Sequence, residues 1–226
     1  MRSFLARTFH PLLRRCYLWW NSTPRTYRYK GLDLLVLPGV FHPGLFGSTR
    51  ILAEHIATFD LRGRSFLELG AGTGLVALVA ARNGAQVTAS DVSGAAVQNL
   101  RENAQRNELP ITVVHSDLFQ ALPGHYDVIA INPPYYARDP RNEAEQAFLA
   151  GSELDYFARL MPALHERIGR GSQVHMVLSA DLDARGIDAL AAQNGIGLAE
   201  VHRGRQFGEA QVVYRLALRT DIDPTG

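Results

Sequence analysis

Residues 65–75 read Ser-Phe-Leu-Glu-Leu-Gly-Ala-Gly-Thr-Gly-Leu, and this stretch decides the fold. A short apolar strand over 65–69 runs into glycines at positions 70, 72 and 74, and a helix is predicted over 74–83. Alternate glycines let the backbone turn sharply and approach a ligand closely, because no Cβ stands in the way. The helix that follows begins with free N–H groups and the positive end of its dipole. The spacing G-x-G-x-G differs from the G-x-G-x-x-G that is typical of dinucleotide sites.

The alternation of strand and helix continues along the chain. Further strands are predicted by the apolar runs at 86–90, 111–115, 126–131 and 173–179. A second helix is predicted over 94–107, with Ser93 as its N-cap. Short continuous apolar strands separated by helices indicate an α/β fold with a mostly parallel sheet covered on both faces. The last two of the seven strands, about 196–203 and 210–218, have no helix between them and must pair antiparallel.

Composition sets the broad class of the protein. The chain has 226 residues, of which 46% are hydrophobic and 20% are charged, as is typical of a globular domain rather than a disordered chain, collagen or coiled coil. The single cysteine, Cys16, excludes an internal disulfide and a cysteine-clustered zinc site. No His, Asp and Glu set has metal-ligand spacing, so we expect no metal. No apolar run approaches the 18 residues of a membrane-spanning helix.

The first 32 residues are basic and contain no Asp or Glu. They hold seven of the 23 basic residues, so the rest has 16 basic residues against 22 acidic ones. Apolar residues at 5, 9, 12, 13, 16 and 20 recur at helical spacing and predict a basic amphipathic helix. Three roles are open for it: packing on the main domain, gripping the phosphates of RNA, DNA or a membrane surface, or targeting. Lacking a secretory signal, the protein is expected in the cytoplasm.

Three segments follow from these patterns. Residues 1–37 are expected to form an extension, made of the basic helix and a short β-hairpin around Lys30-Gly31. Residues 38–219 form the main domain, which opens with a loop rich in proline and glycine and a helix capped by Ser48. Residues 220–226 are expected to be a frayed tail.

Two acidic residues follow the next two strands. Asp91 ends the strand after the glycine loop, where a carboxylate can bind two ribose hydroxyls. Asp117 ends the third strand and can accept a hydrogen bond from an exocyclic amine such as that of adenine. Either could instead cap a turn. Since ligands bind at the carboxyl ends of parallel strands, and the loop brings no Lys or Arg for a phosphate, an adenosine ligand is indicated.

The fourth strand ends in Asn132-Pro133-Pro134-Tyr135. Two prolines stiffen the turn and remove two backbone donors, which leaves the Asn132 side-chain oxygen and the Pro133 carbonyl as acceptors. Two fixed acceptors suit the two N–H bonds of a planar NH₂ group, and Tyr135 offers a flat face for stacking. A rigid turn at the strand end with no chemical role is the alternative. The position of these four residues after a glycine loop and two acidic residues favours the binding role.

These motifs together resemble the class I S-adenosylmethionine-dependent methyltransferases with an Asn-Pro-Pro-Tyr motif. The resemblance covers about residues 38–218 and implies a Rossmann-like sheet, S-adenosylmethionine as cofactor and methyl transfer to nitrogen. Asn132, Pro133 and Tyr135 are the implied catalytic residues, and Pro134, Tyr135, His42 and Pro43 the substrate-binding ones. The implied cofactor-binding residues are Glu68, Gly70, Ala71, Gly72, Gly74, Asp91, Val92, Asp117, Leu118 and Asn132.

Within that branch the sequence is similar to the HemK-type protein-glutamine methyltransferases. The likeness lies in the proline-containing segment Val40-Phe-His-Pro43 and in residues 145–155. A protein glutamine is therefore the first expected substrate. An exocyclic amine of RNA or DNA, bound through the basic N-terminal segment, is the second. A cofactor-binding module without catalysis is the third.

Overall fold

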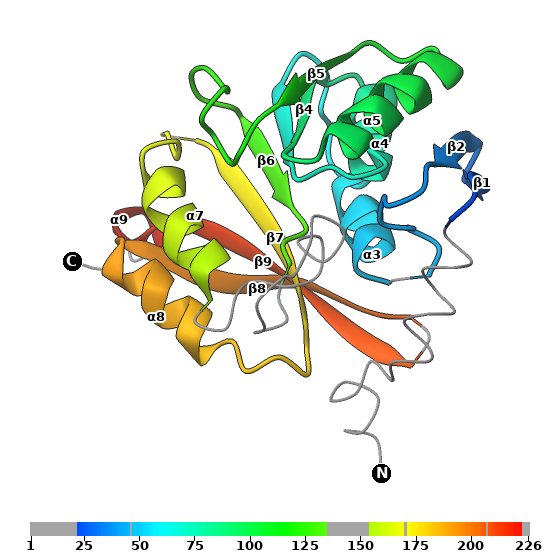
Figure 1. The fold of residues 1–226 in the computed structure, drawn as a ribbon. Helices are drawn as coiled ribbons and strands as arrows, with labels where there is room; N and C mark the ends of the chain where they lie inside the picture. The colour runs from blue at the N-terminus through cyan, green and yellow to red at the C-terminus, as the bar shows by residue number, and fades with distance from the viewer. Residues whose placement is uncertain (1–21, 46, 135–153, 170, 207, 223–226) are drawn as a thin grey trace.

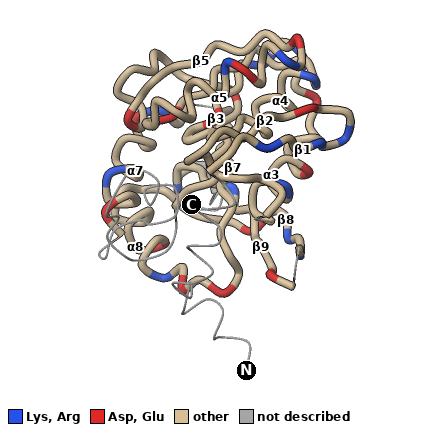
Figure 2. The backbone as a smooth tube through the Cα atoms, turned by 45° about the vertical axis from the view of Figure 1, so that its right-hand side comes forward, with Lys and Arg blue, Asp and Glu red and all other residues tan. Residues whose placement is uncertain are grey.

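The computed structural model describes residues 22–45, 47–134, 154–169, 171–206 and 208–222. The predicted N-terminal helix, Tyr135 and the stretch 145–153 lie outside these residues. None of the helices in the described ranges is long and apolar enough to cross a membrane. Figure 2 shows basic and acidic positions interspersed along the described chain.

A seven-stranded sheet forms the centre of the molecule, as the sequence predicted (Figure 1). Its order is β5-β4-β3-β6-β7-β9-β8, and β9 runs antiparallel to both of its neighbours. The strands are β3 (Ser65–Leu69), β4 (Gln86–Asp91), β5 (Ile111–His115), β6 (Val128–Ile131), β7 (Gln173–Ser179), β8 (Ile196–Gln206) and β9 (Glu209–Leu218). The strand predicted from residue 126 begins at 128; the side chain of the preceding Asp127 accepts from Ser65 N and Ser65 Oγ.

Helices cover both faces of the sheet. One face carries α3 (Gly47–Ile56), α4 (Leu75–Arg82) and α5 (Gly94–Arg106), and the other carries α7 (Asp155–His165) and α8 (Arg185–Gln193). A short α9 (Arg219–Ile222) follows β9. The Ser93 hydroxyl caps α5 as predicted, accepting from the Ala96 N–H at 3.5 Å. The prediction of Ser48 as a cap was wrong: α3 begins one residue earlier, so Ser48 lies inside its first turn.

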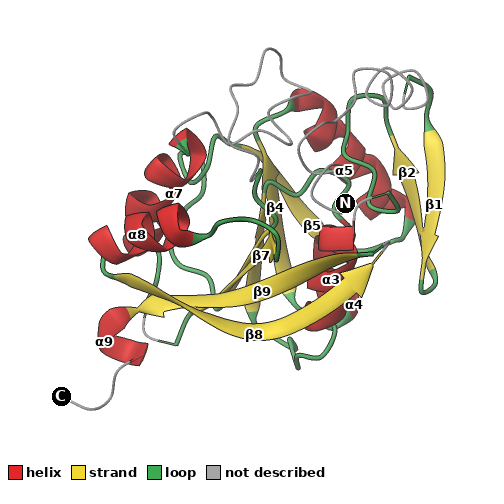
Figure 3. Cartoon of the chain, turned by 90° about the horizontal axis from the view of Figure 1, so that it is seen from below, coloured by secondary structure: helices red, strands yellow, loops and turns green. Residues whose placement is uncertain are grey.

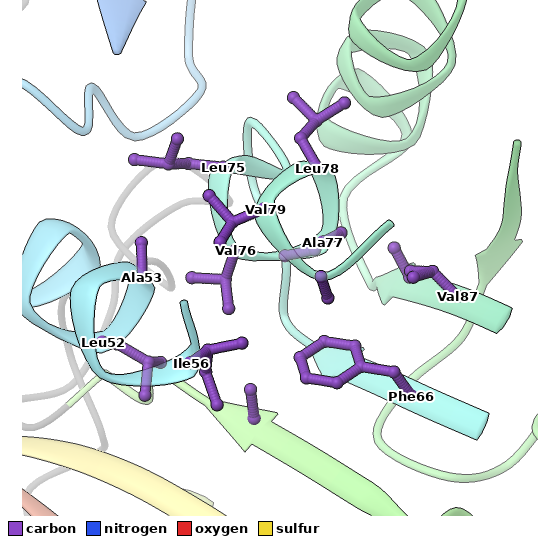
Figure 4. Packing of buried hydrophobic residues seen from close by; sticks show 14 of the residues in the cluster. Leu52, Ala53, Ile56, Phe66, Leu75, Val76, Ala77, Leu78, Val79 and Val87 are labelled. Atoms are coloured by element: carbon purple, nitrogen blue, oxygen red, sulfur yellow. The ribbon is translucent and has the colours of Figure 1, made fainter. Parts of the chain in front are cut away.

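The core divides into two clusters because successive strand residues point to opposite faces. Phe66 of β3 joins the cluster under α3 and α4, whereas the next residue, Leu67, joins the cluster under α7. In Figure 4, Ile56 of α3 and Val76 of α4 point toward each other, and Phe66 faces α4. These side chains are fully buried. The packing fixes α3 and α4 on the sheet, and both helices begin at the edge where the candidate site lies.

The predicted hairpin is present as β1 (Arg25–Tyr29) and β2 (Leu32–Val36). It packs on α5 through three asparagines, Asn99, Asn103 and Asn107, whose side-chain oxygens accept the backbone N–H groups of residues 37, 35 and 33. Helical residues four positions apart are separated by about 6 Å along the helix axis, which is close to the separation of strand residues two positions apart. The three amides therefore bond the edge of β2 as a neighbouring strand does.

The end of the sheet formed by β8 and β9 packs against α3 (Figure 3). Three histidines meet there. His55 Nε2 lies 3.1 Å from His175 Nδ1, and the His55 ring stacks on that of His202 with centroids 5.4 Å apart. Burial lowers the pKa of His55 to about 4 and that of His175 to about 3. Charge repulsion acts in the same direction, from His202 on His55 and from His55 on His175. Both rings are therefore neutral near pH 7.

Candidate functional site

The residues predicted to bind ligand follow neighbouring strands at one edge of the sheet. Leu69 at the end of β3 pairs with Ser90 on one side and with Ile131 on the other. Asp91 pairs with His115 at the end of β5. The glycine loop, Asp91, Asp117 and Asn132 thus leave four adjacent strands at the same edge, where open α/β sheets bind their ligands.

The glycine loop turns through left-handed backbone conformations. Gly70, Gly72 and Gly74 have φ values of +71°, +55° and +78°. A Cβ at Gly74 would also lie 2.4 Å from Leu100 Cδ2 of α5, so the buried Leu100 side chain would have to move to admit it. The loop is closed by its own backbone bonds, from Gly74 N to Ala71 O at 2.8 Å and from Ala71 N to Ser90 O at 2.9 Å. Its shape is therefore set by the protein itself.

Asp91 joins the loop to the end of β4. Its Oδ2 accepts from Gly72 N at 2.9 Å, and its Oδ1 accepts from Ser93 N at 2.9 Å. Burial raises the pKa of Asp91 above its ordinary value, while these backbone hydrogen bonds oppose the rise by favouring the charged form. The backbone N–H of Val92 also favours the charged form, and a carboxylate with about four lone-pair sites can still accept a hydroxyl hydrogen.

Glu68 lies beneath the loop. Its side chain is 3% exposed, and Oε2 accepts from Ala77 N in the first turn of α4 at 2.7 Å. Burial raises the pKa of Glu68 to about 8, against the effect of the Ala77 bond, and the Asp91 charge adds to the rise. Glu68 supports the start of α4 in this structure, and its predicted contact with the methionine part of a cofactor stays a prediction.

Asp117 pairs with a residue that the sequence analysis did not single out. Arg159 of α7 donates to Asp117 Oδ2 at 2.5 Å. The following residue, Leu118, has a positive φ of 47°, and the Ser116 hydroxyl bonds its carbonyl at 2.9 Å. Val92 beside Asp91 is 50% exposed, so an apolar side chain is available at this rim to contact a flat, apolar ring.

Asn132 follows β6 and contacts the first turn of α3. Its Nδ2 donates to Thr49 Oγ1 at 2.9 Å, across 83 residues of sequence. Thr49 is 6% exposed and Asn132 is half-buried. The two prolines that follow Asn132 restrict the backbone at this strand end; Pro133 is buried and Pro134 is half-buried. The sequence analysis missed Thr49, because no spacing pattern links it to residue 132.

The segment before α3 lies over the glycine loop. A Cβ at Gly72 would be 4.0 Å from Phe41 Cβ. His42 is 6% exposed, its Nδ1 accepts from Gly44 N at 3.1 Å, and its ring meets that of Tyr27 edge-on. Pro43 is also buried. Substrate contact by His42 and Pro43 stays a prediction, since the structure shows His42 bonded within the loop and Pro43 buried.

The arrangement fits an adenosine cofactor that carries no phosphate. A tight glycine loop that lets a ligand approach the backbone closely, the Asp91 carboxylate and the exposed apolar side chain of Val92 lie at neighbouring strand ends. The loop itself contains no Lys or Arg that would neutralise a phosphate. Within the described ranges no group of three or more His, Cys, Asp or Glu residues could hold a metal ion.

Comparison with known proteins agrees with this geometry. The family model of the methyltransferase small domain matches residues 31–155, more than half of the chain. The chain belongs to this family. The predicted resemblance to S-adenosylmethionine-dependent methyltransferases, the Rossmann-like fold and the cofactor are thereby confirmed.

Two curated proteins and one solved structure show what the chain is similar to. The chain is 40% identical over 98 residues to the release factor glutamine methyltransferase of Streptococcus pneumoniae, covering 42% of this chain and 35% of that protein. It is 29% identical over 161 residues to ribosomal RNA small subunit methyltransferase C of Actinobacillus pleuropneumoniae, covering 70% and 46%. The Thermus thermophilus 16S rRNA N2 G1207 methyltransferase, solved with AdoMet and guanosine, superposes with a TM-score of 0.63 at 24% identity, covering 86% and 50%. The chain thus spans about a third to a half of these relatives.

Proposed function

We propose that this protein transfers a methyl group from S-adenosylmethionine to a planar NH₂ nitrogen. The observation that carries the proposal is the placement of Asn132 at the end of β6, between the glycine loop and the first turn of α3. Gly72, Asp91, Val92 and Asp117 are proposed to hold the cofactor at the neighbouring strand ends. When bound, the cofactor supplies an electrophilic methyl group on a positively charged sulfur.

The chain's own contribution is to position and polarise the acceptor nitrogen. The lone pair of an amide or aromatic amine is delocalised, so the nitrogen is a poor nucleophile. Asn132 Oδ1 and the Pro133 carbonyl accept its two N–H bonds and thereby favour a lone pair turned toward the methyl group. As the N–C bond forms, the methyl–sulfur bond would break and its electron pair would stay on sulfur, which leaves as a neutral thioether. The nitrogen becomes more acidic and its proton passes to water, so no dedicated base is needed. Positioning of this kind can lower a barrier by about 7–11 kcal/mol.

A protein glutamine is the first proposed substrate. The motif resemblance and the 40% identity over 98 residues to a release factor glutamine methyltransferase support it. A base amine in RNA is the second, supported by the longer match, over 70% of the chain, to a ribosomal RNA methyltransferase. Both present a flat NH₂ group, so the same two acceptors suit either.

Label transfer distinguishes these substrates. The protein is incubated with methyl-labelled S-adenosylmethionine and a cell lysate, and aliquots are digested with protease or nuclease. We expect label on nitrogen in one macromolecular fraction, and Asn132→Ala should lower its rate by well over tenfold while the cofactor affinity, measured by calorimetry, changes less. Equal rates for wild type and Asn132→Ala, or binding of NAD in place of S-adenosylmethionine, would overturn the proposal. Cofactor binding without transfer to any fraction would favour the non-catalytic module.

A further inference from the structure

We infer that Thr49 is a positioning residue for Asn132, fixing the side-chain amide so that its oxygen faces the reacting nitrogen; this inference rests on the proposed function. The direct observation is the 2.9 Å bond from Asn132 Nδ2 to Thr49 Oγ1. Among the described residues, no other hydrogen bond to the Asn132 side chain is recorded. The two ends of the amide therefore differ in environment, with nitrogen toward α3 and oxygen away from it.

Orientation matters because the two ends of an asparagine amide are similar in shape and opposite in hydrogen bonding. The terminal torsion of the side chain is broad, so an amide without a partner samples both orientations. With Oδ1 toward the substrate, Asn132 accepts an N–H of the target group. In the reverse orientation two NH₂ groups face each other, and neither can accept.

The Thr49 hydroxyl can donate as well as accept, but only one orientation of the Asn132 amide lets it bond both Thr49 and a substrate NH₂ group. If Thr49 accepts from Nδ2, the oxygen remains available for the substrate. If Thr49 donates to Oδ1, the amide turns its NH₂ toward another NH₂, and the bond to the substrate is lost. The substrate NH₂ group therefore selects this amide orientation, and Thr49, as the acceptor for Nδ2, bonds the amide in that same orientation. The bond present before the substrate arrives means that the acceptor is already in place, which is the preorganisation that catalysis requires.

Thr49 can serve this purpose because the start of α3 is fixed on both sides of it. A Cβ at Gly47 would lie 2.9 Å from Gln206 Cβ, and a Cβ at Gly204 would lie 2.8 Å from Ile51 Cγ1. Two glycines thus bring the first turns of α3 into close contact with β8, at positions 47 and 51. A β-branched side chain held in this turn also has restricted χ1 freedom. Thr49 is thereby held in a fixed position on α3, from which it bonds Asn132 at the end of β6.

Thr49→Val tests the inference, because valine keeps the shape and removes the hydroxyl. We expect the rate of methyl incorporation into a fixed amount of lysate to fall by about tenfold or more at saturating cofactor, since small misplacements of reacting groups have effects of that size. The dissociation constant of S-adenosylmethionine and the midpoint of urea unfolding should stay near the wild-type values. Thr49→Ser, which keeps the hydroxyl, should restore most of the rate. Thr58→Val is the matched control, since it removes a hydroxyl bonded to His55 O beyond the other end of α3.

A measurement on the free protein separates this inference from the proposed function. In a ¹H–¹⁵N spectrum, the Asn132 side-chain NH₂ signals are identified by their loss in Asn132→Asp. In the wild type one of these protons should exchange slowly with solvent, and Thr49→Val should accelerate its exchange while Thr58→Val does not. Unchanged exchange, or a Thr49→Val enzyme as fast as wild type, would overturn the role of Thr49. If wild type labels no NH₂ nitrogen, the proposed function fails and the NH₂ exchange still decides whether Thr49 holds Asn132.

Discussion

Replacing Asn103 by alanine should destabilise the protein and loosen the glycine loop together. The Asn103 side chain is 1% exposed; its Oδ1 accepts from Leu35 N at 2.7 Å, and its Nδ2 donates to Leu35 O at 2.8 Å and to Thr73 O at 2.9 Å. Alanine leaves the Leu35 N–H and the Thr73 carbonyl without these partners. Each buried polar group left unbonded costs about 1–3 kcal/mol, so the free energy of unfolding should fall by about 2–6 kcal/mol. In a chain of this length a loss of about 3 kcal/mol lowers the melting temperature by about 6–12 °C.

Urea unfolding followed by circular dichroism measures this loss as a lower midpoint at an unchanged slope. Gln98→Ala, at an exposed position of the same helix, is the control and should change stability by less than about 0.5 kcal/mol. Asn107→Ala removes bonds to β2 without touching the glycine loop, so it should weaken stability but not cofactor affinity. Asn103→Ala should weaken both. The reasoning is refuted if Asn103→Ala is as stable as Gln98→Ala, or if it binds S-adenosylmethionine as tightly as Asn107→Ala does.

Two further predictions concern buried groups. Below pH 6.5, His55 and His175 become protonated in the unfolded chain but stay neutral in the folded protein. The free energy of unfolding should therefore fall as the pH is lowered toward about 4, by about 1.4 kcal/mol per pH unit for each histidine. Glu68 has the opposite sign: its pKa of about 8 keeps a proton on the folded protein, so stability should decline as the pH rises from 4.5 to 8, and Glu68→Gln should remove that decline in urea titrations compared with wild type. A difference between the two proteins that does not vary with pH would contradict this assignment. Gly74→Ala combines a left-handed backbone with a 2.4 Å approach to Leu100, and should lower the free energy of unfolding by more than about 2 kcal/mol. Gly94→Ala is the control and should be close to neutral, because nothing lies within 4 Å of the added carbon. Equal effects of the two substitutions would contradict the role given to Gly74.

Much of the fold could be predicted because its strands and helices follow from local patterns of apolar and polar residues. The strands at 65–69, 111–115 and 173–179 match the structure residue for residue, since each is a short apolar run bounded by a turn or a polar residue. Parallel pairing followed from the helices between the early strands, and antiparallel pairing of the last two from the lack of one. The carboxyl ends of parallel strands then share one edge, so Asp91, Asp117 and Asn132 could be placed together without coordinates.

Helix starts were less well determined by the sequence. Ser48 is a good N-cap residue, but α3 begins at Gly47, where close contact with β8 governs the backbone. The spacing of Asn99, Asn103 and Asn107 by four residues was visible as one helical stripe. Its meaning was not, because the partner strand lies more than 60 residues away along the chain.

Only the tertiary structure decided which side chains support the site. Thr49 meets Asn132 across 83 residues, and Arg159 meets Asp117 across 42, through contacts that no periodicity encodes. Glu68 and His42, which the motifs suggested as ligand contacts, are buried and accept from the backbone N–H groups of Ala77 and Gly44, contacts that the motifs did not indicate. Local sequence determines what each strand and turn can form, because backbone preferences and hydrophobic periodicity act over a few residues. The partner of a polar side chain depends on how whole elements pack, and that is fixed only when the chain is folded.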